Sequence, residues 1–171
     1  QYGLATADIT YEIVAEGGLT RLLCAYSNFN KLPPEIGSIR SARQPHIEML
    51  IPLNALYMHI GGSTTGRDML EIYHYKDKEI DGNYQSVRDE AFYFNEARWR
   101  SGQNSEHCWF TNPELVKKAI ENYNLDTTEQ INNAFAFVPY TEQPRVLEGG
   151  SATDIKVAFS QSEKIALNYD A

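Results

Sequence analysis

The stretch ITYEIVAEGGLTRLLCAY, residues 9–26, decides how the chain begins to fold. Two runs rich in β-branched and apolar residues lie on either side of Gly17-Gly18. A glycine pair between two such runs is a strong signal for a two-residue hairpin turn, because both turn positions need positive φ angles. The sequence therefore predicts an antiparallel β-hairpin over this stretch.

The hairpin turn also predicts which side chains share a face. We expect Glu16 to pair with Leu19, which closes the turn. Val14 then lies opposite Arg21, and Arg21 has Glu12 and Glu16 as diagonal neighbours. The polar face then consists of Asp8, Thr10, Glu12, Glu16 and Arg21. The opposite face, which we expect to be buried, carries Ile9, Tyr11, Ile13, Ala15, Leu22 and Cys24.

Downstream of the hairpin, helix and strand signals alternate. Apolar residues at helical spacing predict a helix over residues 45–53, and the run ALYMHI, residues 55–60, predicts a short strand. A second helix is expected directly after Gly61-Gly62-Ser63, where Thr65 and Asp68 have the spacing of a capping box. Residues 76–103 are charged, aromatic and weakly periodic, so we expect a long surface loop with short ordered pieces.

The last third of the chain contains clearer signals. Asn112-Pro113-Glu114 has the residues of a helix start and predicts a helix that ends near Tyr123. A further short helix is expected from Asp126 or Thr127. Residues 154–159 and 165–169 predict the two strands of a second hairpin.

Together these signals predict an α+β fold, with a mixed sheet that contains the N-terminal β-hairpin and helices packed on it. A linker is expected over residues 141–153, where Pro144 and Gly149-Gly150 interrupt any regular pattern. Residues 1–140 then form one domain, and residues 154–171 begin a smaller, incomplete C-terminal β domain. Because Gln1 is not an initiator methionine, we expect the chain to be a piece of a longer protein.

The composition excludes some classes of function. Over 171 residues the formal net charge is −8, which disfavours nucleic acid as a general partner because phosphate binding depends on a basic surface. No apolar stretch approaches the ~20 residues that a transmembrane helix needs. Cys24 and Cys108 form neither a CxxC pair nor a metal cluster, so each is a small buried apolar residue or half of a single disulfide.

Candidate binding residues gather in the segment RSAR, residues 40–43. Arg40 and Arg43 carry guanidinium groups suited to carboxylate or phosphate, and Ser41 adds a hydroxyl just before a predicted helix start. One interpretation is an anion site. The other is that these arginines only stabilise the domain by pairing with the acidic residues Asp8, Glu12, Glu16 or Glu35.

The turn Gly61-Gly62-Ser63 is the second candidate. It lies where a phosphate-binding turn would lie, but it matches neither a Walker loop nor a dinucleotide fingerprint, and a tight turn that needs glycine is the simpler interpretation. His59 precedes the turn at the carboxyl end of a predicted strand, where ligand sites often open. A lone histidine in an apolar run is nevertheless more often a hydrogen-bonded core residue.

His107, within EHCWF at residues 106–110, is the third candidate. It could be combined with His59 and an acidic residue of the hairpin into a metal site, but no ligand spacing such as HExxH supports one. We therefore expect neither a metal nor a cofactor. Ser41 or Ser63 could be paired with a histidine as nucleophile and base, yet no GxSxG elbow is present, so the catalytic residues are unknown and enzymatic activity stays open.

Three segments resemble the YerB-like family of bacterial lipoproteins in order and spacing: GLATADITYEIVAEGGLTRLLCAY from residue 3, IGSIRSAR from residue 36 and ALYMHIGGS from residue 55. The resemblance is close over residues 3–63 and looser over residues 106–111, where the family commonly has a His-Asn-aromatic step and this chain has Cys108 instead. It implies an exported, extracytoplasmic protein that is anchored to the bacterial membrane by a lipid outside this chain. It also implies a further strand before Gln1 and more chain after Ala171, so that another fragment or another copy would complete the sheet.

We expect a cell-envelope domain of unassigned activity that binds an anionic or cell-wall-derived ligand, such as a glycan or a phosphate-bearing precursor. This expectation depends on the hairpin, the arginine segment and the diglycine turn meeting in space. The predicted ligand-binding residues are Asp8, Glu12, Glu16, Arg21, Arg40, Ser41, Arg43, His59, Gly61, Gly62, Ser63 and His107.

Two alternatives remain open. The first is an enzyme acting on a pyrophosphate-linked or glycan cell-wall precursor, by analogy with enzymes that transfer polymers onto peptidoglycan. In that case Arg21, Arg40 and Arg43 would hold pyrophosphate, and Asp8 or Glu12 would hold magnesium. The second is a scaffold that binds another envelope protein through the aromatic side chains of residues 84–109, namely Tyr93, Phe94, Trp99 and Trp109.

Overall fold

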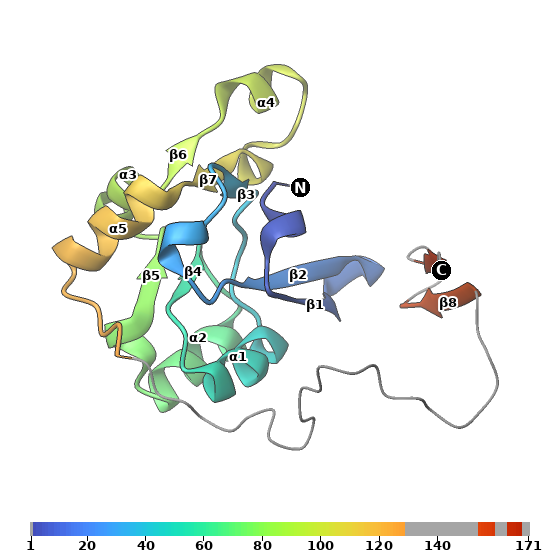
Figure 1. Cartoon of the computed structure of the whole chain (residues 1–171), viewed down its shortest axis with the longest axis horizontal. Coiled ribbons are helices and arrows are strands. Elements are labelled where there is room, and N and C mark those ends of the chain that lie inside the picture. Colours follow the sequence, from blue (N-terminus) through green and yellow to red (C-terminus); the bar gives the residue numbers. More distant parts are fainter. Residues whose placement is uncertain (1, 129–153, 160–163, 169–171) are drawn as a thin grey trace. The chain divides into compact units, whose positions relative to one another are not determined.

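A computed structural model of the chain describes residues 2–128, 154–159 and 164–168 (Figure 1). The helices of this part are α1 (Gln44–Leu50), α2 (Thr64–Ile72), α3 (Gln85–Ala91), α4 (Glu96–Arg100) and α5 (Pro113–Asn122). The strands are β1 (Ile9–Val14), β2 (Thr20–Ala25), β3 (Ile36–Gly37), β4 (Tyr57–His59), β5 (Glu79–Asp81), β6 (Tyr93–Phe94), β7 (Trp109–Thr111), β8 (Asp154–Ala158) and β9 (Lys164–Asn168). The predicted α+β class is confirmed.

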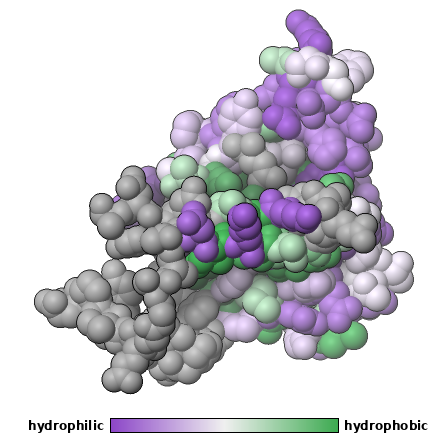
Figure 2. All heavy atoms as spheres, turned by 90° about the vertical axis from the view of Figure 1, so that its right-hand side faces the viewer, coloured by the Kyte–Doolittle hydropathy of each residue, from purple (hydrophilic) through white to green (hydrophobic). Residues whose placement is uncertain are grey.

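The chain divides into two units by its contacts. The first consists of Gln1–Tyr11 and Leu23–Asn132, and the second of Glu12–Leu22 and Asn133–Ala171. The predicted linker over residues 141–153 lies outside the described residues. Figure 2 shows one face of the molecule, on which hydrophobic side chains lie among mainly hydrophilic ones.

The parallel strands β4 and β5 form the centre of the first unit, with Tyr57 opposite Glu79 and His59 opposite Asp81. Because side chains alternate along a strand, consecutive residues of β4 serve two different cores. Tyr57 packs in an apolar cluster with residues of α1 and α2. Met58 packs instead on a second cluster, which contains Ile80 and residues of α3 and α5. The strand pair therefore lies between two helical layers (Figure 1).

Residues 36–42 connect this strand pair to a second sheet. β3 pairs antiparallel with β7, which pairs on its other side with β6. After β3, residues 40–42 run parallel to the end of β4. Ile60 donates its backbone N–H to the Arg40 carbonyl at 3.1 Å, and Ala42 forms a parallel β-bridge with Gly62. The arginine segment and the diglycine turn thus lie side by side in space, joined by backbone hydrogen bonds, as predicted.

The N-terminal hairpin forms as predicted, but its register differs by one residue. Gly17 and Gly18 have φ angles of 70° and 73°, and Leu19 donates to the Glu16 carbonyl at 3.4 Å, as a two-residue turn requires. Ala15 also donates to the Leu19 carbonyl at 2.7 Å. Ala15 and Glu16 therefore both oppose Leu19, which is the geometry of a β-bulge.

The bulge overturns our prediction of which residues share a face. Thr10 lies against Cys24, with 3.9 Å between Oγ1 and Sγ, and Thr20 donates to the Glu12 carboxylate at 2.6 Å. Even-numbered residues of both strands therefore share one face, so that Leu22 and Cys24 do not lie with Ile9 and its neighbours. Arg21 lies on the other face from Glu12, because a register shift of one residue reverses every side chain of a strand.

Three of the predicted helices form as α1, α2 and α5, with one different cap. Asn112 accepts from the Leu115 N–H at 2.9 Å and caps α5, as expected. At α2, by contrast, Ser63 accepts from the Gly66 N–H at 3.1 Å, so the helix begins at Thr64. The predicted capping box, two residues later, is wrong because Ser63 is already extended and next to the turn.

Residues 76–103 contain the short ordered pieces that we expected, but they leave little of the segment as a loop. This segment contains β5, α3, β6 and α4. The two helices have 7 and 5 residues, which is too short to give a clear 3.6-residue period. β5 is a three-residue strand whose pairing with β4 is parallel, so no adjacent hairpin turn marks it in the sequence.

The predicted C-terminal hairpin is confirmed, since β8 pairs antiparallel with β9. Asp126 and Thr127 begin no helix within the described residues; the Asp126 carboxylate accepts from the Thr128 N–H at 2.9 Å. The rest of the helix predicted there lies outside the described residues. Cys24 and Cys108 are both free, and Cys108 is fully buried.

Candidate functional site

A group of polar side chains lies on one face of the pair of β4 and β5, with His59 and Asp81 at the carboxyl ends of the two strands and Glu79 at the start of β5. Since the two strands are parallel and in register, His59, Glu79 and Asp81 project from the same face of the pair. His59 is 1% exposed, and its ring stacks on Tyr57 with 4.7 Å between ring centroids. The side chains of Asp81 and Glu79 are 11% and 23% exposed. The site therefore places one buried imidazole between two partly buried carboxylates.

Both ring nitrogens of His59 face oxygen atoms. Nδ1 is 2.8 Å from the Gly61 carbonyl oxygen and 3.6 Å from the Asp81 carboxylate. Nε2 is 2.8 Å from the Glu79 carboxylate. One ligand atom from each of these three side chains lies within 4.8 Å of the other two, so they are the described residues that could hold a metal ion together. His59 is thus a buried histidine whose two ring nitrogens both face oxygen atoms.

Asp81 connects this group to the diglycine turn. Its Oδ1 accepts from the backbone N–H groups of Gly61 and Asn83, each at 2.8 Å. Gly61 has a φ angle of 70°, a conformation that glycine adopts without strain. The carboxylate therefore fixes the turn that leads into α2.

A second polar group surrounds the turn itself. A Cβ atom on Gly61 would lie 3.7 Å from both Ser41 Oγ and Asn83 Oδ1 and 3.8 Å from Arg67 Nη2. The aliphatic part of Arg67 covers Gly62. Among the described residues, the Arg67 guanidinium forms no hydrogen bond or ion pair. Sequence reasoning missed Arg67, although its position four residues after the Ser63 cap places it on the first turn of α2.

The two arginines predicted to form an anion site have partners within the chain. Arg40 donates from Nη1 to the Glu106 carbonyl at 2.9 Å, and its Nη2 lies 3.3 Å from the Glu106 carboxylate. The same guanidinium is 3.3 Å from His107 Nδ1, so these two predicted residues do meet. Arg43 donates to the Ala42 carbonyl at 2.9 Å.

The predicted site residues of the hairpin also have local partners. In the first unit, Asp8 accepts from the Ser27 N–H at 2.7 Å, and this bond lowers the pKa of the Asp8 carboxyl below its usual value. In the second unit, Arg21 lies 3.6 Å from the Glu16 carboxylate, which the sequence predicted. Glu12 accepts from Thr20 and is not the partner that we expected for Arg21. Whether these residues share a ligand with Arg40, Arg43 and Ser63 stays a prediction.

Three of the four aromatic side chains predicted to bind a partner form a local cluster, whereas Tyr93 packs on Phe110. The Phe94 ring lies 5.8 Å from the Trp99 ring and 5.2 Å from the Trp109 ring. Arg88 stacks over Trp109 at 5.1 Å, and Trp99 is 53% exposed. The cluster therefore packs largely on itself, with one ring open to solvent.

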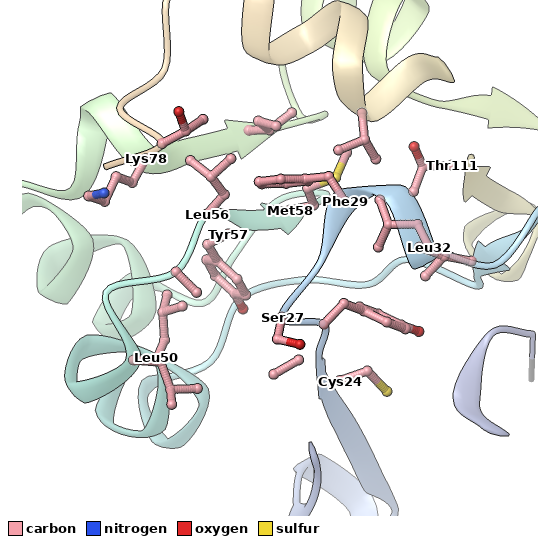
Figure 3. A pocket seen from close by; sticks show the side chains of 18 of the residues that line it. Cys24, Ser27, Phe29, Leu32, Leu50, Leu56, Tyr57, Met58, Lys78 and Thr111 are labelled. Carbon is pink, nitrogen blue, oxygen red and sulfur yellow. The ribbon is translucent and has the colours of Figure 1, made fainter. Parts of the chain in front are cut away.

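The first unit also contains a cavity of about 710 Å³, which the sequence did not predict (Figure 3). Apolar side chains from β2, from the turn after it and from β4 line it, and α5 contributes Val116. In Figure 3, Leu32, Leu50 and Met58 approach it from different parts of the chain. Residues of both apolar clusters line the cavity, Leu50 from the first and Ile80 from the second. The cavity therefore separates the two clusters at this point.

Polar groups occupy the margin of this cavity. Lys78 Nζ donates to the Asp126 carbonyl at 3.0 Å and lies 3.1 Å from the Asp126 carboxylate. Hydrogen bonds from the side chain and backbone of Thr128, with a further one from Lys78, lower the pKa of Asp126 to about 2. Asn54 also lines the cavity, and its buried side-chain nitrogen has no hydrogen-bond partner among the described residues.

None of the helices in the described part of the chain is long and apolar enough to span a membrane. The chain is 26% identical over 133 residues to "Putative lipoprotein YerB" of Bacillus subtilis (strain 168), an alignment covering 77% of this chain and 37% of that protein. Its fold is similar to the crystal structure of the YerB protein from Bacillus subtilis, with a TM-score of 0.71 at 22% sequence identity, over 98% of this chain and 51% of that chain.

The chain therefore spans about half the length of the solved relative that it matches. These similarities confirm the predicted YerB-like resemblance. Residues 1–126 match the family model described as "Protein of unknown function (DUF3048) N-terminal domain". Since the match covers most of the chain, the chain belongs to this family.

Proposed function

We propose that the chain is the ligand-binding domain of a lipid-anchored, extracytoplasmic protein, and that an amphipathic small molecule binds in its apolar cavity. The location is supported by the name of the Bacillus subtilis relative, which describes a lipoprotein. The binding activity is supported by the structure of the first unit alone.

The observation that carries the proposal is the cavity between the two apolar clusters. Its volume of about 710 Å³ lies inside the range of roughly 300–1,000 Å³ that is typical of small-molecule sites. Protein interiors are normally packed as densely as organic crystals, so apolar walls that leave such a space lose dispersion contacts. An apolar group of a ligand restores those contacts.

The lining also indicates how the ligand is oriented. Leu56, Met58 and the other apolar side chains provide contact for a hydrocarbon chain, whereas Lys78 and Asp126 provide charge at the margin. Asn54 offers a donor that an oxygen atom of the ligand would satisfy, which removes a penalty of about 1–3 kcal/mol for a buried unpaired group. We therefore expect a molecule with one apolar chain and a polar end, the chemistry of envelope lipids and lipid-linked precursors.

Binding of the fluorescent apolar probe N-phenyl-1-naphthylamine, followed by displacement with a single-chain lysophospholipid, tests this proposal. Ala25→Phe places a ring in the cavity, because Ala25 lines it. We expect the variant to bind the probe at least about tenfold more weakly, since added side-chain volume displaces the ligand. Ala97→Phe, the same change at an exposed alanine of α4, is the matched control and should bind as the natural sequence does.

A folded Ala25→Phe chain with unchanged probe affinity would refute the cavity as the binding site. Circular dichroism and thermal unfolding establish that the variant is folded. Loss of binding in both variants to the same extent would also contradict the proposal, because only one of them changes the cavity.

The predicted anionic ligand has a second candidate position, at the diglycine turn. The supporting observation is the Arg67 guanidinium, which has no hydrogen bond or ion pair among the described residues and lies near Ser41 and Gly61. A guanidinium group without a partner, beside a hydroxyl and a glycine turn, suits a phosphate or carboxylate oxygen. On this arrangement Arg67, rather than Arg40 or Arg43, provides the charge.

A further inference from the structure

The contact between His59 Nε2 and Glu79 requires a proton or a cation between its two atoms. The Gly61 carbonyl oxygen can only accept, so Nδ1 of His59 carries a proton and donates it. Nε2 is 2.8 Å from Glu79 Oε1, and a carboxylate oxygen and an unprotonated ring nitrogen would repel each other at that distance. Either a proton or a metal cation lies between Nε2 and Glu79.

The surroundings of His59 match those of a metal-bound histidine. Histidine ligands usually donate their second ring N–H to a carbonyl or carboxylate, which fixes the tautomer and the ring orientation. The bond from Nδ1 to Gly61 does this here. Asp81 is also held in place, because its Oδ1 accepts from the backbone N–H groups of Gly61 and Asn83.

The charge balance also favours a cation. Two carboxyl groups, Glu79 and Asp81, lie beside an imidazole ring that is 1% exposed. Among the described residues, no lysine or arginine forms an ion pair with either carboxylate. Buried or partly buried charges are usually paired or bound to a metal, because desolvation is otherwise unfavourable.

We propose that His59 Nε2, Glu79 and Asp81 bind a divalent cation, of which zinc fits best. An imidazole nitrogen with two carboxylates is a donor set that zinc accepts, with bonds of about 2.0–2.2 Å and a fourth position for water. Tetrahedral zinc separates two such ligand atoms by about 3.4 Å, so Glu79 needs to move about 0.6 Å away from Nε2. One potential ligand atom of each side chain, with either ring nitrogen counted for His59, lies within 4.8 Å of the other two. The Asp81 carboxylate is 3.6 Å from Nδ1 and must turn towards Nε2, and Glu79, the most exposed of the three side chains, can make the movement required of it.

Titration calorimetry with zinc chloride tests the site, on the tag-free chain after treatment with a chelator. We expect one zinc ion per chain. Glu79→Gln should weaken binding at least about tenfold, because the amide offers a neutral and weaker donor. Glu106→Gln is the matched control, since Glu106 also lies beside a histidine, 3.6 Å from His107 Nε2, and should leave zinc affinity unchanged.

Nitrogen NMR of the imidazole rings provides an independent readout. Zinc should shift Nε2 of His59 while Nδ1 keeps its proton, and the other histidines should not respond. If Glu79→Gln does not fold, Asp81→Asn replaces it, because the asparagine oxygen can still accept from Gly61 and Asn83. Absence of zinc binding to the natural sequence, or equal affinity in the Glu79→Gln and Glu106→Gln chains, would overturn the proposal and leave a shared proton between Nε2 and Glu79.

Discussion

At the scale of single residues, Arg40 and Arg67 differ in what their guanidinium groups contact. Arg40 faces a carbonyl, a carboxylate and an imidazole within 3.3 Å, so an incoming anion would compete with partners that are already in place. Arg67 has no such partner among the described residues and covers Gly62 with its aliphatic part. An anion that binds at the diglycine turn therefore depends on Arg67.

Pyrophosphate binding measures this difference. We expect Arg67→Gln to reduce pyrophosphate affinity by about tenfold or more, because a charge-assisted hydrogen bond to phosphate is lost. Arg100→Gln, a change of equal charge at an exposed position of α4, should have no such effect. Equal affinities of the two variants would show that Arg67 is not the anion ligand.

At the scale of elements, local capping and turn geometry set where α2 begins and how the hairpin pairs. Ser63 is extended, with ψ of 158°, and its hydroxyl accepts from Gly66, so the helix begins one residue later. In the hairpin, the turn of Gly17-Gly18 was predicted, but the bulge at Ala15 and Glu16 was not. A bulge has no sequence signature of its own, since it changes only which residues oppose one another.

Alanine substitutions at α2 test the capping residue. Ser63→Ala should lower the free energy of unfolding by about 1 kcal/mol, because the first turn loses its side-chain acceptor. Thr65→Ala, which the sequence identified as the cap, should change stability by only a few tenths of a kcal/mol, since it lies inside the first turn. Urea unfolding of both variants gives the two values, and a larger effect of Thr65→Ala would contradict the assignment.

At the scale of the whole molecule, residues distant in sequence close the first unit after α5. Asp126 donates its N–H to the Asp77 carbonyl at 3.0 Å, and its carboxylate pairs with Lys78 and with Thr128. These contacts join the chain after α5 to the chain before β5. The margin of the cavity is therefore held by a carboxylate that must be ionised.

Stability in acid should reveal this closure. The pKa of Asp126 is lowered from 3.8 to about 2, so its contribution to stability is present above pH 4 and is lost as the pH falls towards 2. Asp126→Asn should therefore be less stable than the natural sequence at neutral pH, with a difference that disappears near pH 2. Asp89→Asn, at an exposed carboxylate without a hydrogen bond or ion pair among the described residues, should show no such pH dependence.

The fold was predictable from the sequence wherever a local signal specifies local structure. Gly17-Gly18 specified a hairpin turn, and Asn112-Pro113 specified the start of α5, because a turn or a cap depends on residues within a few positions. The expected meeting of RSAR with the diglycine turn is also seen, in the backbone bond between Ile60 and Arg40. The family resemblance followed from the same segments.

The site and the cavity were decided by tertiary structure alone. Glu79 and Asp81 gave no signal, because only the parallel pairing of β5 with β4, across 20 residues, places them beside His59. The cavity depends on the distance between the two apolar clusters on either side of the strand pair. The pattern of side chains within a single element does not determine that distance. Turns and helix caps depend on hydrogen bonds between residues close in sequence, so sequence patterns predict them. The cavity and the grouping of Glu79 and Asp81 around His59 arise only when distant segments pack together.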